Sequence, residues 1–486
     1  IDGVHHEDGH IILLHDAGGD TRKPTIEALP RIIETLQHEG YQFISLEQYL
    51  GMNKQTLMPA INKGKAYYAM QTNLWLAEMI YHVSDFLTAL FLVFLVLGMM
   101  RLIFMYVLTF REKRAENRRN YAPIDAATAP AVSIIVPGYN EEVNIVRTIT
   151  TLKQQDYPNL HIYFVDDGSK DHTLERVREA FDTDDKVTVL AKKNGGKASA
   201  LNYGIAACRS EYVVCIDADT QLKQDAVSRL MKHFIADKDK RIGAVAGNVK
   251  VGNQRNMLTY WQAIEYTSSQ NFDRMAYSNI NAITVVPGAI GAFRKEVIEE
   301  VGGFTTDTLA EDCDLTMSIN EHGYIIENEN YAVAMTEAPE TLRQFVKQRI
   351  RWCFGVMQAF WKHRSSLFSP SKKGFGLWAM PNMLIFQYII PTFSPLADVL
   401  MLIGLFSGNA LQIFFYYLIF LLIDASVSIM AYIFEGERLW VLLWVIPQRF
   451  FYRWIMYYVL FKSYLKAIKG ELQTWGVLKR TGHVSE

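Results

Sequence analysis

Acidic residues recur in pairs through the middle of this 486-residue chain. An Asp-Asp pair at 166–167 and an Asp-Ala-Asp motif at 217–219 each follow an apolar run, and a Glu-Asp pair at 311–312 opens a predicted helix. Carboxylate oxygens are the ligands that hard divalent cations prefer, and a carboxylate also serves as a general base. The pattern therefore predicts a metal and a base gathered around one ligand.

The strands and helices that must position these carboxylates predict an α/β fold with a doubly wound sheet. Apolar runs at 132–136, 161–165, 187–190 and 212–216 are short and rich in Val and Ile, as buried strands are. Helical patterns separate the runs, and ligands of such sheets bind beyond the carboxyl ends of the strands. Each acidic group that follows a strand is thus expected at the ligand edge.

The Asp-Ala-Asp motif is the predicted cation site. A lone Asp-x-Asp is usually a turn or a helix cap, but this one follows a buried strand at the ligand edge. We predict that Asp217 and Asp219 hold the cation, which leaves its other positions to diphosphate oxygens and water. Lys197 follows the glycines at 195–196 and is predicted to neutralise phosphate, with an exposed loop lysine as the alternative.

Two further segments are candidates for the acceptor side. Gly288 and Ala289 lie in a glycine-containing stretch where an acceptor sugar could approach the backbone, unless the stretch is only a turn before a helix at 295–301. Asp312 is predicted to take the proton from an acceptor hydroxyl, with a helix cap as the alternative.

A Gln-x-x-Arg-Trp motif at 348–352 lies on a predicted amphipathic stretch covering 341–377. Arg351 offers a planar donor fork to a diphosphate, and Trp352 offers a flat apolar face to a pyranose ring. The alternative is a basic, aromatic helix that only rests at a membrane interface.

The net charge of −2 and the mean hydropathy of +0.03 conceal a polar middle between apolar ends. The predicted first span lies within 75–110, where residues 86–110 are long enough to cross a hydrocarbon layer of about 30 Å. Arg101 interrupts this span and is expected to snorkel toward an interface. Basic residues at 111, 113, 114, 118 and 119 follow, which predicts a cytoplasmic middle region.

The C-terminal third predicts three or four further membrane helices within 378–467, before a tail at 468–486. Pro391 and Pro395 predict either a kinked span or two re-entrant pieces in the first of them. Arg449 and Arg453 are costly in lipid, so we expect them to line a protein interior or a wet passage, or else to snorkel. The four cysteines lack metal-site spacing and are expected to be reduced.

The first 60 residues predict a strand at 11–14, a helix ending near His38, a stop at Gly40 and a second strand at 41–46. The Leu-Leu-His-Asp stretch at 13–16 resembles the end of a polysaccharide deacetylase domain, in which His15 would lie near the active site. The earlier metal-binding motifs of that family are absent from the sequence, so His15 is expected to have no catalytic function here.

The combined motifs of the middle region resemble processive family 2 glycosyltransferases, the membrane synthases of poly-N-acetylglucosamine, hyaluronan, chitin and cellulose. The motifs are Pro-Gly-Tyr-Asn-Glu at 137–141, Asp-Asp-Gly-Ser at 166–169, Asp-Ala-Asp at 217–219, Glu-Asp at 311–312 and Gln-x-x-Arg-Trp at 348–352. The resemblance covers about 75–486 and implies a cytoplasmic GT-A-type domain with a doubly wound mixed sheet at 121–340, with α-helical transmembrane segments on both sides. Members commonly have Thr before the Glu-Asp pair where this chain has Ala310, but the base is retained.

The resemblance also implies a role for each matching residue. The residues implied to bind the UDP-sugar are Tyr139, Glu141, Asp166, Asp167, Lys197, Asp217, Gln348 and Arg351. Asp217 and Asp219 are implied to hold a Mg²⁺ or Mn²⁺ ion, and Asp312 and Glu311 to be catalytic. Gly288, Ala289 and Trp352 are implied to bind the acceptor.

Within this family the segments at 286–294, 310–316 and 475–482 look most like the poly-β-1,6-N-acetylglucosamine synthase type. The implied function is polymerisation of N-acetylglucosamine from UDP-N-acetylglucosamine by a multi-pass enzyme of the cell membrane, which also translocates the growing polysaccharide. The resemblance allows a small accessory membrane subunit and implies no nucleic-acid partner. Alternatives are a chitin, hyaluronan-like or glucan synthase, a transferase that adds one sugar to a lipid carrier, and a non-catalytic scaffold. A nicotinamide-dependent oxidoreductase is disfavoured because no Gly-x-Gly-x-x-Gly follows the first strand.

Overall fold

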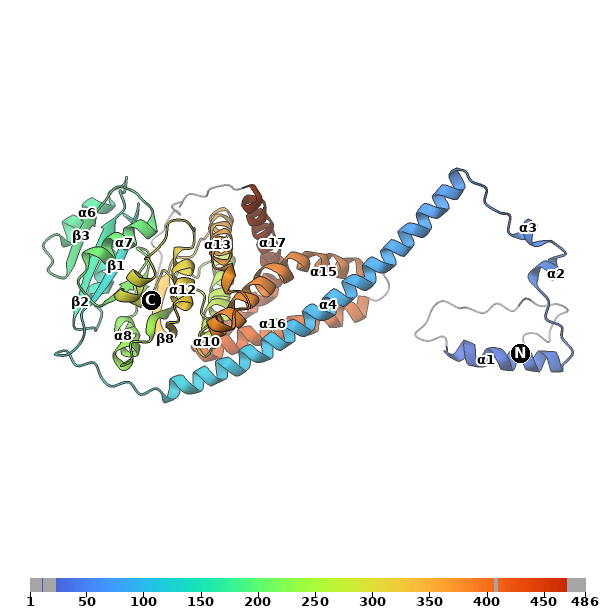
Figure 1. The fold of residues 1–486 in the computed structure, drawn as a ribbon, viewed down its shortest axis with the longest axis horizontal. Coiled ribbons are helices and arrows are strands. Elements are labelled where there is room, and N and C mark those ends of the chain that lie inside the picture. Colours follow the sequence, from blue (N-terminus) through green and yellow to red (C-terminus); the bar gives the residue numbers. More distant parts are fainter. Residues whose placement is uncertain (1–10, 12–22, 406–409, 470–486) are drawn as a thin grey trace. The chain divides into compact units, whose positions relative to one another are not determined.

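The computed structural model describes residues 11, 23–405 and 410–469 (Figure 1). The chain divides into two compact units, residues 1–90 and residues 91–486. The long helix α4 (Lys65–Arg118) begins in the first unit and ends in the second. Each unit is described separately below.

The first unit contains helices and no strand among its described residues. Helix α1 (Lys23–His38) agrees with the prediction, and Gly40 adopts a φ of 96° just after it. The strand predicted at 41–46 is wrong: the backbone there is irregular and leads into α2 (Leu46–Leu50), which Ser45 caps, followed by α3 (Lys54–Leu57). A strand needs a partner edge for its backbone groups, and no described strand of this unit provides one. Residues 12–15, with the predicted strand and His15, lie outside the described part.

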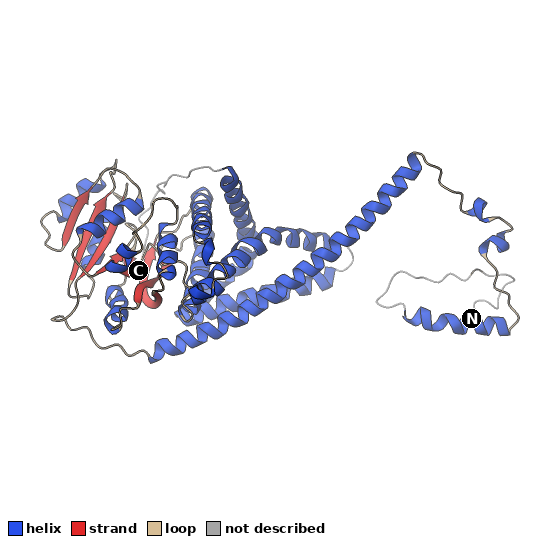
Figure 2. Ribbon diagram, in the orientation of Figure 1, coloured by secondary structure: helices blue, strands red, loops and turns tan. Residues whose placement is uncertain are grey.

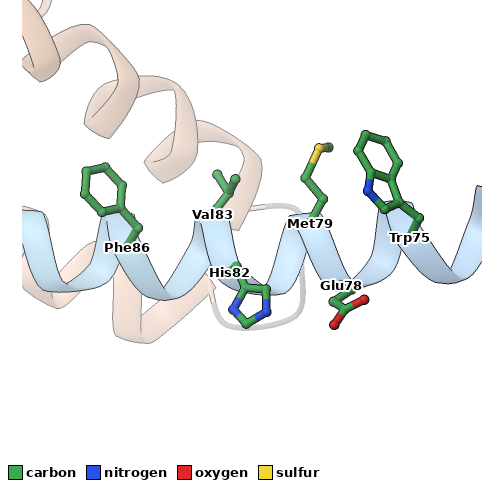
Figure 3. Close-up of a pocket in the computed structure, with 6 residues that line it drawn as sticks. All are labelled: Trp75, Glu78, Met79, His82, Val83 and Phe86. Atoms are coloured by element: carbon green, nitrogen blue, oxygen red, sulfur yellow. The ribbon is translucent and has the colours of Figure 1, made fainter.

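A shallow recess lies on the first unit's part of α4, and none of the residues that line it is a predicted site residue. Trp75, Met79, Val83 and Phe86 project from one side of the helix, and Glu78 and His82 point away from them (Figure 3). Its lining is mostly apolar and includes no acidic pair. The recess therefore lacks the chemistry that the sequence predicts for a donor site.

The second unit is built on one mixed sheet of eight strands (Figure 2). The order is β3-β2-β1-β4-β7-β6-β8-β5, with β3, β2, β1 and β4 parallel and β7 antiparallel to its neighbours. The four predicted strands are confirmed to within two residues at each end. The strands are β1 (Val132–Gly138), β2 (Leu160–Asp166), β3 (Val187–Ala191), β4 (Tyr212–Cys215), β5 (Gln221–Leu222), β6 (Ile242–Val251), β7 (Gly291–Arg294) and β8 (Ile325–Thr336).

Both faces of this sheet are buried, as a doubly wound fold requires. Successive residues of β1 point to opposite faces, so Ile135 belongs to one core and Ile134 and Val136 to the other. The first core includes α7 and α12, and the second includes α5, α6 and α8. The helices of this part are α5 (Ile145–Lys153), α6 (Thr173–Phe181), α7 (Lys197–Ala207), α8 (Ala226–Ala236), α9 (Met257–Glu265), α10 (Phe272–Ser278), α11 (Lys295–Glu300), α12 (Glu311–Glu321) and α13 (Leu342–Lys362), with a π-helix at Tyr266–Asn271.

The C-terminal part is helical. Short 3₁₀ turns (Arg364–Ser366, Pro370–Lys372) precede a continuous helical run through π-helices Phe375–Ala379 and Met383–Ile389, α14 (Met380–Asn382) and α15 (Ile390–Leu405). Pro391 has no amide hydrogen, and a wider π-helical turn precedes it, so the run continues without the predicted re-entrant break. Helix α16 (Ala410–Glu435), a 3₁₀ turn (Leu439–Trp444) and α17 (Val445–Lys469) complete it.

Two helical runs among the described residues are long and apolar enough to cross a bilayer, Lys65–Arg118 and Phe375–Leu402. Both fall where the sequence predicts spans. The arrangement of the remaining predicted spans stays a prediction.

Two arginines of the apolar helices pair with carboxylates: Arg101 does not snorkel as predicted, whereas Arg453 faces another helix, which is one of the predicted alternatives. Arg101 was expected to snorkel, but it forms a 2.8 Å ion pair with Asp273 and donates a hydrogen bond to Asn382. Arg453 pairs with Asp398 of α15 at 3.2 Å, so α15 and α17 are joined through this arginine. Opposite charges in apolar surroundings lower each other's desolvation cost, which explains why both arginines turn toward carboxylates.

Candidate active site

Four of the predicted site residues form one cluster of charges at the ligand edge of the sheet. The Nζ atom of Lys197 lies 2.6 Å from Oδ1 of Asp217 and 3.0 Å from Oε1 of Glu311. Asp312 is adjacent to Glu311 and also interacts with the Lys197 charge. We call Lys197, Asp217, Glu311 and Asp312 the Lys197 cluster.

Each member of the Lys197 cluster occupies the end of a regular element. Asp217 lies just after β4, in a tight turn closed by a hydrogen bond from the Thr220 amide to the Asp217 carbonyl oxygen. Lys197 is the first residue of α7, and Glu311 and Asp312 are the first two residues of α12. Carboxylates in a helix's first turn are stabilised by the N-terminal end of its dipole.

Asp312 faces the glycine stretch that the sequence singled out. Its Oδ2 accepts a 3.3 Å hydrogen bond from the Gly288 amide, and its Oδ1 accepts one from Cys313. A Cβ atom on Gly288 would lie 2.5 Å from the Lys197 ammonium, so only glycine fits there without displacing that side chain. Gly288 therefore belongs with the cluster, while Ala289 packs in the core just beyond it.

The environment of Asp312 suits a general base near neutral pH. Burial and the negative charge of Glu311 raise the pKa of Asp312 to about 6, although the Lys197 charge and the Cys313 amide act to lower it. A base is most effective when its pKa lies near the working pH. Burial acts to lower the pKa of Lys197, but Asp217 and Glu311 outweigh it and raise that pKa, so the lysine stays charged.

Asp167, from the acidic pair at 166–167, stabilises a loop and does not belong to the Lys197 cluster. Oδ1 of Asp167 forms an ion pair with Nζ of Lys192 at 2.7 Å, and the same carboxylate accepts hydrogen bonds from the Gly195 and Gly196 amides. Gly196 immediately precedes Lys197, with a φ of 87° that favours glycine. Asp167 thus fixes the loop that presents the lysine.

Asp166 closes its own loop by accepting bonds from the Gly168 and Ser169 amides through Oδ2. Its other oxygen, Oδ1, is buried and has no hydrogen-bond partner. A buried acceptor of this kind is costly unless a ligand completes it. This orphaned oxygen fits the predicted uridine contact.

Tyr139 and Glu141 lie in the half-buried loop after β1, beside the Asp166 loop. The Glu141 amide donates to Thr173, and the Asn140 amide donates to Ser169, so the two loops are joined. Asn140 adopts a φ of 57°, a left-handed conformation that asparagine tolerates better than most residues. Together these loops form one continuous surface after β1 and β2.

The Gln-x-x-Arg-Trp motif lies in α13. Gln348 is buried with its Oε1 lacking a hydrogen-bond partner, and Arg351 and Trp352 are half-buried. Trp352 packs against the same core cluster as Ala289. Among the described residues, no hydrogen bond or ion pair links the three predicted α13 residues to the Lys197 cluster.

One supporting residue of α13 was missed from the sequence. Arg349 is buried, forms a 2.8 Å ion pair with Glu265 and lies over the Trp352 ring at 4.7 Å. Burial acts to lower its pKa, but Glu265 outweighs this and raises it. The arginine therefore supports the indole of Trp352, and its place inside the motif was the available signal.

Asp219 is 4% exposed and lies in the same turn as Asp217. No group of three or more His, Cys, Asp or Glu side chains in the described part is arranged to hold a metal ion. The protein thus offers two carboxylates on one turn, and a cation there would take further oxygen ligands from a substrate or water.

Comparison with known proteins identifies the central domain. Residues 133–302 match the family model described as glycosyl transferase family 2. The chain is 31% identical over 256 residues to the poly-beta-1,6-N-acetyl-D-glucosamine synthase of Staphylococcus epidermidis, a match that covers 52% of this chain and 62% of the relative. A protein of the same name from Staphylococcus aureus (strain COL) is 32% identical over 260 residues, covering 53% of this chain and 61% of the relative. The chain therefore spans about six-tenths of the length of these relatives.

A solved structure supports the fold. The mannosyltransferase from Pyrobaculum calidifontis in complex with GDP-Man and Mn²⁺ superposes with a TM-score of 0.51 and 23% identity, over 72% of this chain and 95% of that one. At this identity the likeness concerns the fold alone. The predicted resemblance is thus confirmed for the central domain: residues 133–302 form a glycosyl transferase family 2 domain, and about half of the chain is similar to proteins named poly-beta-1,6-N-acetyl-D-glucosamine synthase.

Proposed function

We propose that the protein is a membrane-bound, inverting and processive glycosyltransferase that polymerises N-acetylglucosamine from UDP-N-acetylglucosamine into a β-linked polysaccharide and translocates it. The observation that carries this proposal is the Lys197 cluster, which brings a base, a phosphate-binding cation and a metal-binding turn to one edge of the sheet. The names of the relatives support the choice of N-acetylglucosamine.

The donor occupies the loops after β1, β2 and β4 in this proposal. The buried Asp166 oxygen would accept from the uracil ring, with Tyr139 and Glu141 beside it. Asp217 and Asp219 would hold Mg²⁺ or Mn²⁺, which stabilises the negative charge that develops on the leaving diphosphate. The solved relative of the same fold contains Mn²⁺, which agrees with a divalent cation. Lys197 would exchange its contact with Asp217 for a diphosphate oxygen, since both are anionic partners.

Transfer requires one base on the acceptor side. Asp312 would remove the proton of an acceptor hydroxyl as its oxygen bonds to the anomeric carbon. The bond from that carbon to the diphosphate oxygen breaks in the same step, and UDP leaves. A single displacement of this kind inverts the anomeric configuration. Trp352, supported by Arg349, would stack against the terminal sugar of the polymer.

The membrane placement rests on the two apolar helical runs, α4 and Phe375–Leu402. The basic segment after the apolar part of α4 favours a cytoplasmic catalytic domain. Product would then cross the bilayer beside these helices.

The test is a donor panel offered to the purified full-length chain in lipid nanodiscs with Mn²⁺ or Mg²⁺. We expect UDP release and a long product from UDP-N-acetylglucosamine, a product that a β-N-acetylhexosaminidase degrades, and loss of activity after chelation. Asp312→Asn should abolish the product, whereas Asp182→Asn, an exposed aspartate outside the site, should not. A product of one added sugar would support the lipid-carrier alternative, and UDP release undiminished in Asp312→Asn would contradict the proposal.

A further inference from the structure

A second group of charged side chains joins the base helix α12 to α13, beyond the Lys197 cluster. Asp314, two residues after Asp312, is 0% exposed. Its carboxylate accepts hydrogen bonds from Thr305 at 2.5 Å, from Lys362 at 2.9 Å and from His363 at 2.9 Å. Lys362 and His363 lie at the C-terminal end of α13, so this carboxylate links the two helices directly.

The histidine of this group is held on both sides. Nε2 of His363 faces Asp314, and Nδ1 lies 2.8 Å from Oε2 of Glu321 at the other end of α12. Only a protonated imidazole donates from both nitrogens. Burial acts to lower the pKa of His363, but its hydrogen bonds to Asp314 and Glu321 raise it to about 9. At neutral pH the histidine is therefore a cation that holds α12 at two points.

The same face of α13 also touches the backbone just before Asp312. A Cβ atom on Gly355 would lie 2.7 Å from the Ala310 amide nitrogen, so the two backbones meet too closely for any larger residue. Gln358 accepts a 3.1 Å hydrogen bond from the Leu309 amide. Residues three or four apart share a helix face, so positions 348, 352, 355, 359, 362 and 363 form one stripe along α13.

We propose that Asp314, Lys362 and His363 are positioning residues that fix α13 in register on α12, and so set the separation between the base Asp312 and the acceptor-binding Trp352. This inference rests on the proposed function. The stripe places Trp352 about three turns before Lys362 and His363, and the close approach at Gly355 lies between them. Loosening the cluster would shift the acceptor side relative to the base, while the uridine-binding loops of the sheet keep their contacts.

The expected defect is that the donor is hydrolysed by water more often than its sugar is transferred to the polymer. With the terminal sugar out of place, water takes its position: the water oxygen bonds to the anomeric carbon, the bond to the diphosphate breaks, UDP leaves and Asp312 receives the proton. UDP release would then exceed sugar incorporation. A loss of folded protein alone would reduce both in proportion.

The experiment compares His363→Gln with His233→Gln in the full-length enzyme. His233 is a matched control, because it is buried and pairs with Glu329 at 3.0 Å on α8 and β8, away from the α12–α13 contact. We expect the ratio of UDP released to N-acetylglucosamine incorporated to rise at least about tenfold in His363→Gln, with a small change in donor KM, and to stay at the wild-type value in His233→Gln. An unchanged ratio in His363→Gln, or an equal rise in both variants, would overturn the inference.

A second measurement does not depend on activity. Hydrogen exchange of the amides at 309–316 should become faster in His363→Gln and remain unchanged in His233→Gln, because only the first variant frees α12 from α13. Lys362→Arg should preserve slow exchange and Lys362→Met should not. Exchange unchanged in both His363→Gln and Lys362→Met would refute the positioning role. If exchange changes as expected but wild-type enzyme releases no UDP from any donor, the proposed function fails and the helix contact stands.

Discussion

Two acidic groups follow the strands on either side of β1, and their surroundings differ. After β2, Asp167 accepts hydrogen bonds from Lys192 and from two loop amides, so its carboxylate stabilises the loop. After β4, Asp217 faces Lys197 with about a third of its side chain exposed, in a cluster that Glu311 and Asp312 complete. Asp167 is thus structural, whereas Asp217 belongs to the cluster that we propose for the chemistry, although both residues follow strands at the same edge of the sheet.

The two groups are also connected. The loop that Asp167 holds ends at Gly196, and the next residue is Lys197. A change at Asp167 should therefore reach the chemistry only through the position of the lysine. The predictions below separate these two contributions.

The largest effect is expected from Asp312→Asn. Removing a general base typically lowers kcat by about 10²–10⁴-fold, and the amide keeps the size of the side chain. Steady-state UDP release measures kcat, with Asp182→Asn as the aspartate control. A kcat within tenfold of wild type would assign the base to another residue.

Lys197→Met should lower kcat/KM by about 10–100-fold, the effect of losing one charge-assisted hydrogen bond to the diphosphate. Lys197→Arg keeps the charge and should recover part of this loss. If Met and Arg behave alike, the lysine charge is not what the site uses.

Asp167→Asn should act mainly on stability. The asparagine cannot pair with Lys192, and the loss of a buried ionic partner costs about 1–3 kcal/mol. Thermal unfolding in nanodiscs should show the lower stability, while kcat/KM falls less than in Lys197→Met. A kcat loss as large as that of Asp312→Asn would end the distinction between the two acidic groups.

The smallest effect concerns pH. Because Asp312 must be deprotonated to accept a proton and its pKa is raised to about 6, kcat should rise with pH up to about 6 and then level off. In Lys197→Met the rise should move to higher pH, because the lysine charge acts to lower the pKa of Asp312. A profile of kcat that is flat from pH 4.5 to 8 in wild type would exclude Asp312 as the titrating base.

Strands β1 to β4 of the sheet could be predicted from the sequence, and strands β5 to β8 could not. Strands β1 to β4 are near-continuous apolar runs, broken only by single residues such as Ser133 and Thr188, and such runs are typical of buried strands. Strand β7 begins at Gly291 and β6 contains Gly247, where a Cβ atom would lie 2.7 Å from Ile290, so these glycines are required by close packing. Glycine normally indicates a turn, which is the alternative that the sequence offers for the stretch before Arg294, so no strand is predicted there.

The candidate site could also be predicted only in part from the sequence. Strand ends placed Asp217 correctly beside Lys197, because parallel strands deliver their following residues to one edge. The sequence did not reveal that Asp167 is used internally, since a motif does not show which amides surround it. Nor did it reveal the Asp314 and His363 contact, which depends on how α12 and α13 pack.

The most direct test of the central claim is equilibrium binding of UDP-N-acetylglucosamine, with Mn²⁺, to wild type, Asp312→Asn and Asp217→Asn. If the Lys197 cluster combines a donor site with a separate base, Asp312→Asn should bind the donor with wild-type Kd although it fails to transfer sugar, and Asp217→Asn should bind more weakly. Loss of donor binding in Asp312→Asn, or wild-type Kd in Asp217→Asn, would contradict the account.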